Sequence, residues 1–175
     1  MIATNGQSTE KSYLESLRAE PWVRSGKITV AFIGGSPLDL VRGAARRRDA
    51  EDYDDAWAVC DVDSYETDNA IREATRADIE LLWSNPCFEV WLILHRTECT
   101  VHFDNAKQCH KKLVSVLGRW DKSQLSFDDF KDGIKDAWQR AKALDDPPSG
   151  NPSTAVWRLV EDLCAQEPER IGQSD

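Results

Sequence analysis

Short apolar runs alternate with helical patterns along the first half of the chain. An apolar repeat at a spacing of three to four residues, which is typical of a helix, follows each of the first two runs, and a polar helix pattern follows the third. Strands that alternate with helices in this way predict an α/β fold with a doubly wound, mostly parallel sheet. The predicted strands cover residues 2–4, 27–33, 55–60 and 79–83.

The second half of the chain has a mostly helical pattern that begins after Pro86. A loop at 145–150 and the sequence Asn151-Pro-Ser-Thr precede the final amphipathic stretch. We therefore expect a single domain over residues 1–166, with an α/β core at about 1–95, a helical part at about 96–166 and a frayed tail at 167–175. The predicted helices of this half cover residues 88–94, 105–117, 127–143 and 156–163.

Composition narrows the class of protein. A chain of 175 residues with 41% hydrophobic content suits one compact domain. The five cysteines form no CxxC pair and no apolar leader follows the first residue, so we expect a reduced, cytoplasmic protein. No apolar run approaches the roughly 18 to 20 residues that cross a bilayer, so we expect no membrane partner.

The net charge of −9 counts against a protein that coats nucleic acid by bulk electrostatics. It leaves room for a small basic patch or for a contact through a metal ion. The densest basic run is Arg42, Arg46, Arg47 and Arg48. This run is interpreted first as a solvated helix face, and second as a contact for a phosphate backbone.

Two carboxylates, Asp61 and Asp63, lie one residue apart at the end of the third predicted strand. They share a face if the strand continues through them, because alternate side chains of a strand point the same way. Like charges so placed repel each other unless a cation lies between them, and ligation by oxygen alone suits Mg²⁺ or Mn²⁺. The same spacing also occurs in ordinary surface turns.

A second candidate lies where the fourth strand meets the buried helix, in the sequence Ser84-Asn85-Pro86-Cys87-Phe88-Glu89. The simpler interpretation is a helix cap, in which Ser84 or Asn85 accepts helix N–H groups and Glu89 complements the helix dipole. The alternative is that Asn85 and Glu89 belong to a functional site.

Cysteine and histidine chemistry has weaker support. The spacing of His95, Cys99, His102, Cys109 and His110 matches no usual structural zinc pattern. The cysteines Cys60 and Cys87 flank apolar runs and are interpreted as small core residues rather than nucleophiles.

Four motifs in order carry a resemblance to a known family. They are Gly6-Gln-Ser-Thr-Glu10 after the first strand, Trp57-Ala-Val-Cys-Asp-Val-Asp63, Ser84-Asn-Pro-Cys-Phe-Glu-Val-Trp-Leu-Ile-Leu-His95, and Asn151-Pro-Ser-Thr154, which opens the last helix. Over about residues 2–164 the chain resembles the RloB family. The resemblance implies a Toprim-like fold, a relation to the AbiLii abortive-infection proteins and a metal-dependent nuclease in antiphage defence.

The resemblance also implies roles for residues. Asp61 and Asp63 match the pair that holds Mg²⁺, and a glutamate after the first strand acts as general acid or base. This chain has Asn5 where the resemblance places that glutamate, and an amide cannot take up a proton as a carboxylate does. Either Glu10 or Glu89 provides the third acid, or the protein binds without cleaving.

Two hypotheses follow from these roles. The first is a Mg²⁺-dependent (or Mn²⁺-dependent) phosphodiesterase that acts on DNA or RNA, with Asp61 and Asp63 as ligands, Glu10 and Glu89 as supporting acids, and Asn5 orienting substrate or water. Substrate contacts are assigned to Asn85, Arg46, Arg47 and Arg48. The second is a non-catalytic defence module that binds an ATPase partner through its acidic surface. Both hypotheses leave the oligomeric state open.

Overall fold

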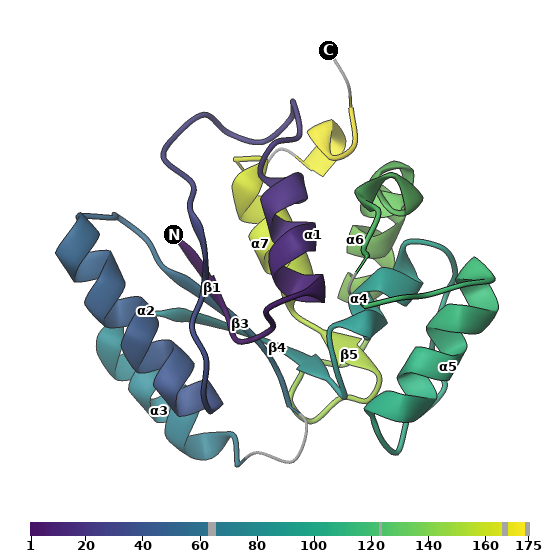
Figure 1. Ribbon diagram of the computed structural model, residues 1–175, viewed down its shortest axis with the longest axis horizontal. Coiled ribbons are helices and arrows are strands. Elements are labelled where there is room, and N and C mark those ends of the chain that lie inside the picture. Colours follow the sequence, from purple (N-terminus) through teal and green to yellow (C-terminus); the bar gives the residue numbers. More distant parts are fainter. Residues whose placement is uncertain (63–65, 123, 166–167, 174–175) are drawn as a thin grey trace.

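The computed structural model describes residues 1–62, 66–122, 124–165 and 168–173. The sheet within these residues has the strand order β2-β1-β3-β4-β5. Figure 1 labels the last four of these strands. The first four strands are parallel, and β5 pairs with β4 in the antiparallel direction. This arrangement confirms the predicted α/β class with a mostly parallel sheet. The strands are β1 (Ile2–Thr4), β2 (Val30–Phe32), β3 (Trp57–Asp61), β4 (Glu80–Asn85) and β5 (Ser153–Thr154).

Helices cover both faces of the sheet. The helices α2 and α3 pack on one face, while α1 and α7 lie on the other, beside a group formed by α4, α5 and α6 (Figure 1). None of the described helices is long and apolar enough to cross a membrane. The helices are α1 (Thr9–Leu17), α2 (Pro37–Glu51), α3 (Asp68–Ala77), α4 (Glu89–Leu94), α5 (Ala106–Leu117), α6 (Ile134–Lys142) and α7 (Val156–Leu163), with 3₁₀ turns at Phe127–Asp129, Lys131–Gly133 and Pro168–Arg170.

Alternation along the strands separates two hydrophobic cores. Val59 of β3 points into the larger core beneath α1, α4 and α7, whereas its neighbours Ala58 and Cys60 point into the smaller core beneath α2 and α3. Because side chains two residues apart in a strand share a face, Asp61 lies on the same side as Val59. The alternation therefore directs the Asp61 carboxylate toward α1 and α4.

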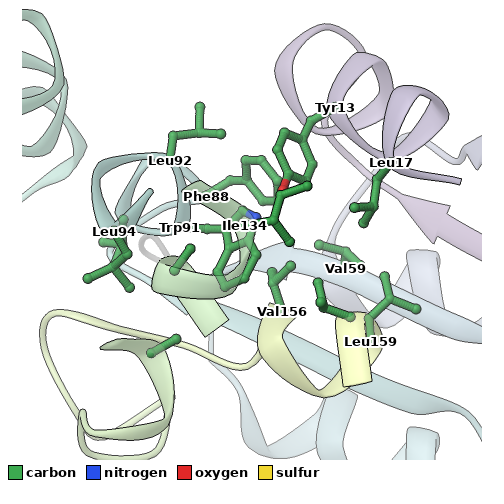
Figure 2. Close-up of a cluster of buried hydrophobic side chains, with 14 of the residues drawn as sticks. Tyr13, Leu17, Val59, Phe88, Trp91, Leu92, Leu94, Ile134, Val156 and Leu159 are labelled. Atoms are coloured by element: carbon green, nitrogen blue, oxygen red, sulfur yellow. The ribbon is translucent and has the colours of Figure 1, made fainter. Parts of the chain in front are cut away.

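The larger core is built around the short helix α4, whose residues are all buried. Figure 2 shows Tyr13 of α1 and Trp91 of α4 meeting among aliphatic side chains of β3, α6 and α7. A helix that is apolar all round must be enclosed by other elements, and α4 is covered in this way by α5, α6 and α1. The start of α4 is consequently held firmly against the end of β4.

His95, at the end of α4, is a structural residue of this core. Its Nδ1–H donates to the carbonyl oxygen of Phe130 at 2.7 Å, so Nε2 accepts from the Tyr13 hydroxyl at 3.0 Å. Burial lowers the pKa of His95 to about 3, so that the ring is neutral. The His95 side chain thus locks α1 to the helical part of the protein.

Four details differ from the sequence-based expectations. The expected strand at 27–33 is regular only over Val30–Phe32, and the expected helix at 127–143 is split into two 3₁₀ turns and α6. Ser153–Thr154, expected to open the last helix, instead forms β5, because Ser84 Oγ and Thr154 Oγ1 meet at 2.8 Å and the backbones pair. In the segment expected to fray, Ile171 is buried against the larger core.

Candidate active site

Three carboxylates meet beyond the carboxyl ends of β1, β3 and β4. Asp61 is the last residue of β3, Glu89 is the first residue of α4, and Glu10 is in the first turn of α1. The pKa of Asp61 is raised well above its ordinary value, first by burial and then by the negative charges of Glu10 and Glu89. The three residues are therefore close enough to oppose one another's ionisation.

Asp61 also holds the start of α4. Its Oδ1 accepts a hydrogen bond from the Phe88 backbone N–H at 2.8 Å. Asp61 thus accepts a backbone N–H at the start of α4, a role that the capping interpretation assigned to Ser84 or Asn85. The Asn85 amide instead donates to the carbonyl oxygens of Pro148 at 2.7 Å and Gly150 at 2.9 Å. Asp61 is thus fixed relative to α4, and Asn85 ties β4 to the loop before β5.

The carboxylate of Glu10 lies against the turn that follows β1. A Cβ atom at Gly6 would overlap the Glu10 carboxyl group, so this carboxylate occupies the space that any other side chain at position 6 would fill. Burial and the charge of Glu89 raise the pKa of Glu10, although its own backbone N–H and Lys122 act in the opposite direction. The Glu10 carboxylate of α1 therefore lies beside Gly6, the residue after Asn5, whose own side chain is an amide.

Glu89 is the most deeply buried of the three acids, at 2% exposure. His110 Nε2 donates to Glu89 Oε1 at 2.7 Å, and Lys122 Nζ lies 3.2 Å from the same oxygen. Burial would raise the pKa of Glu89, but a hydrogen bond from Cys87 together with Lys122 and His110 lowers it below its usual range. Glu89 therefore keeps its charge inside the protein.

Sequence reasoning missed His110 and Lys122. His110 lies on α5 and Lys122 follows that helix, 21 and 33 positions beyond Glu89 respectively. In the sequence, His110 belongs only to a His/Cys spacing that matches no usual zinc pattern. The motifs that drew attention to the acids contain neither residue, and only the packing of α5 against α4 brings them to Glu89.

The arginines assigned to substrate binding lie elsewhere. They occupy the last turns of α2, which packs on the opposite face of the sheet from Asp61. Arg48 Nη1 donates to the carbonyl oxygens of Ala77 at 2.9 Å and Asp78 at 2.7 Å, and Arg47 pairs with Glu51 at 2.7 Å. The structure places Arg46 on the exposed surface of α2 and does not bring this run to the acids.

The donor set is chemically suited to a hard divalent cation. Glu10 and Asp61 present carboxylate oxygens, and Mg²⁺ is commonly held by one or two carboxylates with water and substrate phosphate completing its shell. Within the described ranges no group of three or more His, Cys, Asp or Glu side chains is arranged to hold a metal ion. Asp63, the second predicted ligand, lies outside the described residues.

The fold and this site define a mixed α/β protein with an acid cluster at the carboxyl edge of a parallel sheet, which is where open α/β sheets place their ligands. The model of the RloB-like protein family matches residues 1–163, and the chain belongs to this family. No curated protein and no solved structure matched the chain.

Proposed function

We propose that this RloB-like protein is a Mg²⁺-dependent or Mn²⁺-dependent nuclease that cleaves phosphodiester bonds in DNA or RNA as part of antiphage defence. The observation that carries the proposal is the convergence of Glu10, Asp61 and Glu89, in which Asp61 has a strongly raised pKa. Protein interiors rarely retain uncompensated carboxylates, and a divalent ion is the usual compensation in phosphoryl-transfer sites.

Asp61 and Asp63 would hold the metal ion. A bound divalent ion neutralises the charge of the scissile phosphate and lowers the pKa of a coordinated water. The hydrogen bond from the Phe88 N–H fixes Asp61 Oδ1, which leaves its other oxygen as the free donor. The ligand is thus oriented before the ion binds, which reduces the entropy lost on binding.

Glu10 is the residue assigned to proton transfer. A general base is most effective when its pKa lies near the working pH, and burial with the charge of Glu89 moves the pKa of Glu10 in that direction. Its carboxylate lies over Gly6, beside Asn5, so the acid expected from the strand end is provided by α1. Asn5 would orient substrate or water through its amide, and Glu89 would support the site as a fixed negative charge.

The test compares the wild-type protein with Asp61→Ala and with Glu80→Gln, a change to an exposed carboxylate at the other end of β4. Calorimetric titration with Mn²⁺ measures metal uptake, and incubation with plasmid DNA or tRNA measures cleavage. We expect wild-type and Glu80→Gln proteins to bind Mn²⁺ and cleave, and Asp61→Ala to do neither. Equal cleavage by Asp61→Ala would refute the proposal.

Asn5 gives the non-catalytic alternative its support, because the amide replaces the acid that the family resemblance implies. In that case the acidic surface would contact an ATPase partner. Absence of Mn²⁺ uptake at millimolar concentration, together with an intact fold, would favour this second function. Metal-dependent cleavage by the pure protein would exclude it.

A further inference from the structure

Lys122 reaches over the acid cluster from the segment that follows α5. Its Nζ lies 3.2 Å from Glu89 Oε1, while its side chain is 55% exposed and that of Glu89 is only 3% exposed. The lysine thus touches the site from the solvent side. Lysine carries its charge on a flexible four-carbon stem, so its ammonium can move by several ångströms while the backbone stays in place.

The charge of Lys122 acts on the whole cluster. It lowers the pKa of Glu10, of Asp61 and of Glu89, so its ammonium partly neutralises all three acids. A divalent cation held by Asp61, inside the same cluster, would take over this task. Like charges in close proximity repel, and the ammonium would then be driven from the acids toward any anion nearby.

Glu89 does not depend on Lys122 alone. The second hydrogen bond, from His110 Nε2 at 2.7 Å, remains when the ammonium moves away. A buried carboxylate without any partner would destabilise the protein. Glu89 avoids this cost because it keeps a short hydrogen bond from an imidazole. The departure of Lys122 is therefore permitted by the geometry.

We propose that Lys122 is a further substrate-binding residue: its ammonium neutralises the acid cluster in the metal-free protein and contacts the phosphodiester when Asp61 holds a divalent ion. This inference rests on the proposed nuclease function. It assigns the phosphate contact to a residue outside every sequence motif, in place of the arginines of α2, which lie on the other face of the sheet.

The experiment compares Lys122→Met with Lys131→Met as a matched control. Lys131 is also a half-exposed lysine in an ion pair, with Asp128 at 2.7 Å, but it lies outside the acid cluster. Calorimetry measures Mn²⁺ affinity, and cleavage of bis(p-nitrophenyl) phosphate, a small phosphodiester, gives KM and kcat separately. Circular dichroism checks the fold, and Lys122→Gln repeats the test with a polar side chain.

For Lys122→Met we expect about threefold to tenfold tighter Mn²⁺ binding, because a competing positive charge is gone. We also expect a KM about tenfold or more above the wild-type value, since a charge-assisted contact to the phosphodiester is lost. Lys122→Arg should restore most of the phosphodiester binding, and Lys131→Met should match the wild-type protein in both measurements.

The outcomes separate this inference from the proposed function. If the wild-type protein binds Mn²⁺ and cleaves, but Lys122→Met binds Mn²⁺ no more tightly or keeps its KM, the role of Lys122 is overturned and the nuclease stands. If the wild-type protein takes up no Mn²⁺, the nuclease function fails and the role of Lys122 fails with it. If Lys122→Met binds Mn²⁺ more weakly and also loses activity, Lys122 forms only a structural ion pair, and its proposed role is overturned.

Discussion

Replacing Asp61 with Asn should stabilise the metal-free protein while it destroys the proposed metal site. The change removes a negative charge from a place where burial, Glu10 and Glu89 all disfavour it. The Asn side chain has nearly the same shape, and its carbonyl oxygen can still accept the hydrogen bond from the Phe88 N–H. Electrostatic repulsion is therefore relieved without loss of the contact that fixes α4.

The direction of the pH dependence follows from the same pKa values. Asp61 and Glu10 both have raised pKa values in the folded protein, above ordinary values of 3.8 and 4.5. The folded state consequently binds these protons more tightly than the unfolded chain does. Their contribution to the free energy of unfolding is fully present below these ordinary values and is lost as the pH rises through the raised ones.

The magnitude comes from the link between proton affinity and free energy. A tenfold increase in the proton affinity of one carboxyl group corresponds to about 1.4 kcal/mol of repulsion in its charged form. Asp61 stands at the carboxyl end of the central strand β3 and its residue is only partly buried, so solvent screens some of this repulsion. We expect Asp61→Asn to raise the free energy of unfolding by about 1 kcal/mol at pH 7.5 and by much less at pH 4.

Urea denaturation at the two pH values, with EDTA present, measures this difference. Glu80→Gln is the control because its carboxylate is exposed at the opposite end of β4. Addition of Mn²⁺ should stabilise the wild-type protein and leave Asp61→Asn unchanged. An Asp61→Asn protein that is less stable than wild type at pH 7.5 would show that the three carboxylates do not repel one another as the structure indicates.

The other predictions concern neighbouring contacts. Gly6→Ala should reduce cleavage at least tenfold, because the new Cβ displaces the Glu10 carboxylate, and thermal unfolding should show little loss of stability. Tyr13→Phe should lower the free energy of unfolding by about 1 to 3 kcal/mol in urea denaturation, because the buried Nε2 of His95 loses its hydrogen-bond partner; an unchanged midpoint would contradict that hydrogen bond. Asn85→Ala should lower the free energy of unfolding by about 1 to 2 kcal/mol, because the Asn85 amide donates to two backbone carbonyl oxygens. The KM of this variant for cleavage should equal the wild-type value.

Local pattern was sufficient for the elements that form the first half of the sheet. Each of these elements is set by residues that are close together in the sequence. This applies to the turn after β1, to the apolar spacing of α1 and to the apolar runs of β3 and β4. The position of an acid at the end of β3 could be predicted in the same way. Its role as a candidate ligand followed because ligands bind beyond the carboxyl ends of parallel strands. The family model matches residues 1–163, a range that contains all of these elements.

Other features required contacts between distant parts of the chain. A strand as short as β5 has no pattern of its own and exists only because β4 offers unpaired backbone groups. The same holds for His110 and Lys122, which become partners of Glu89 only when α5 packs against α4. Sequence by itself determined the positions of the first four strands and of most helices, and where an acid ends a strand, because those depend on neighbours in the chain. The tertiary structure alone decided which charges oppose or neutralise each other, because Coulomb interactions depend on distance through space.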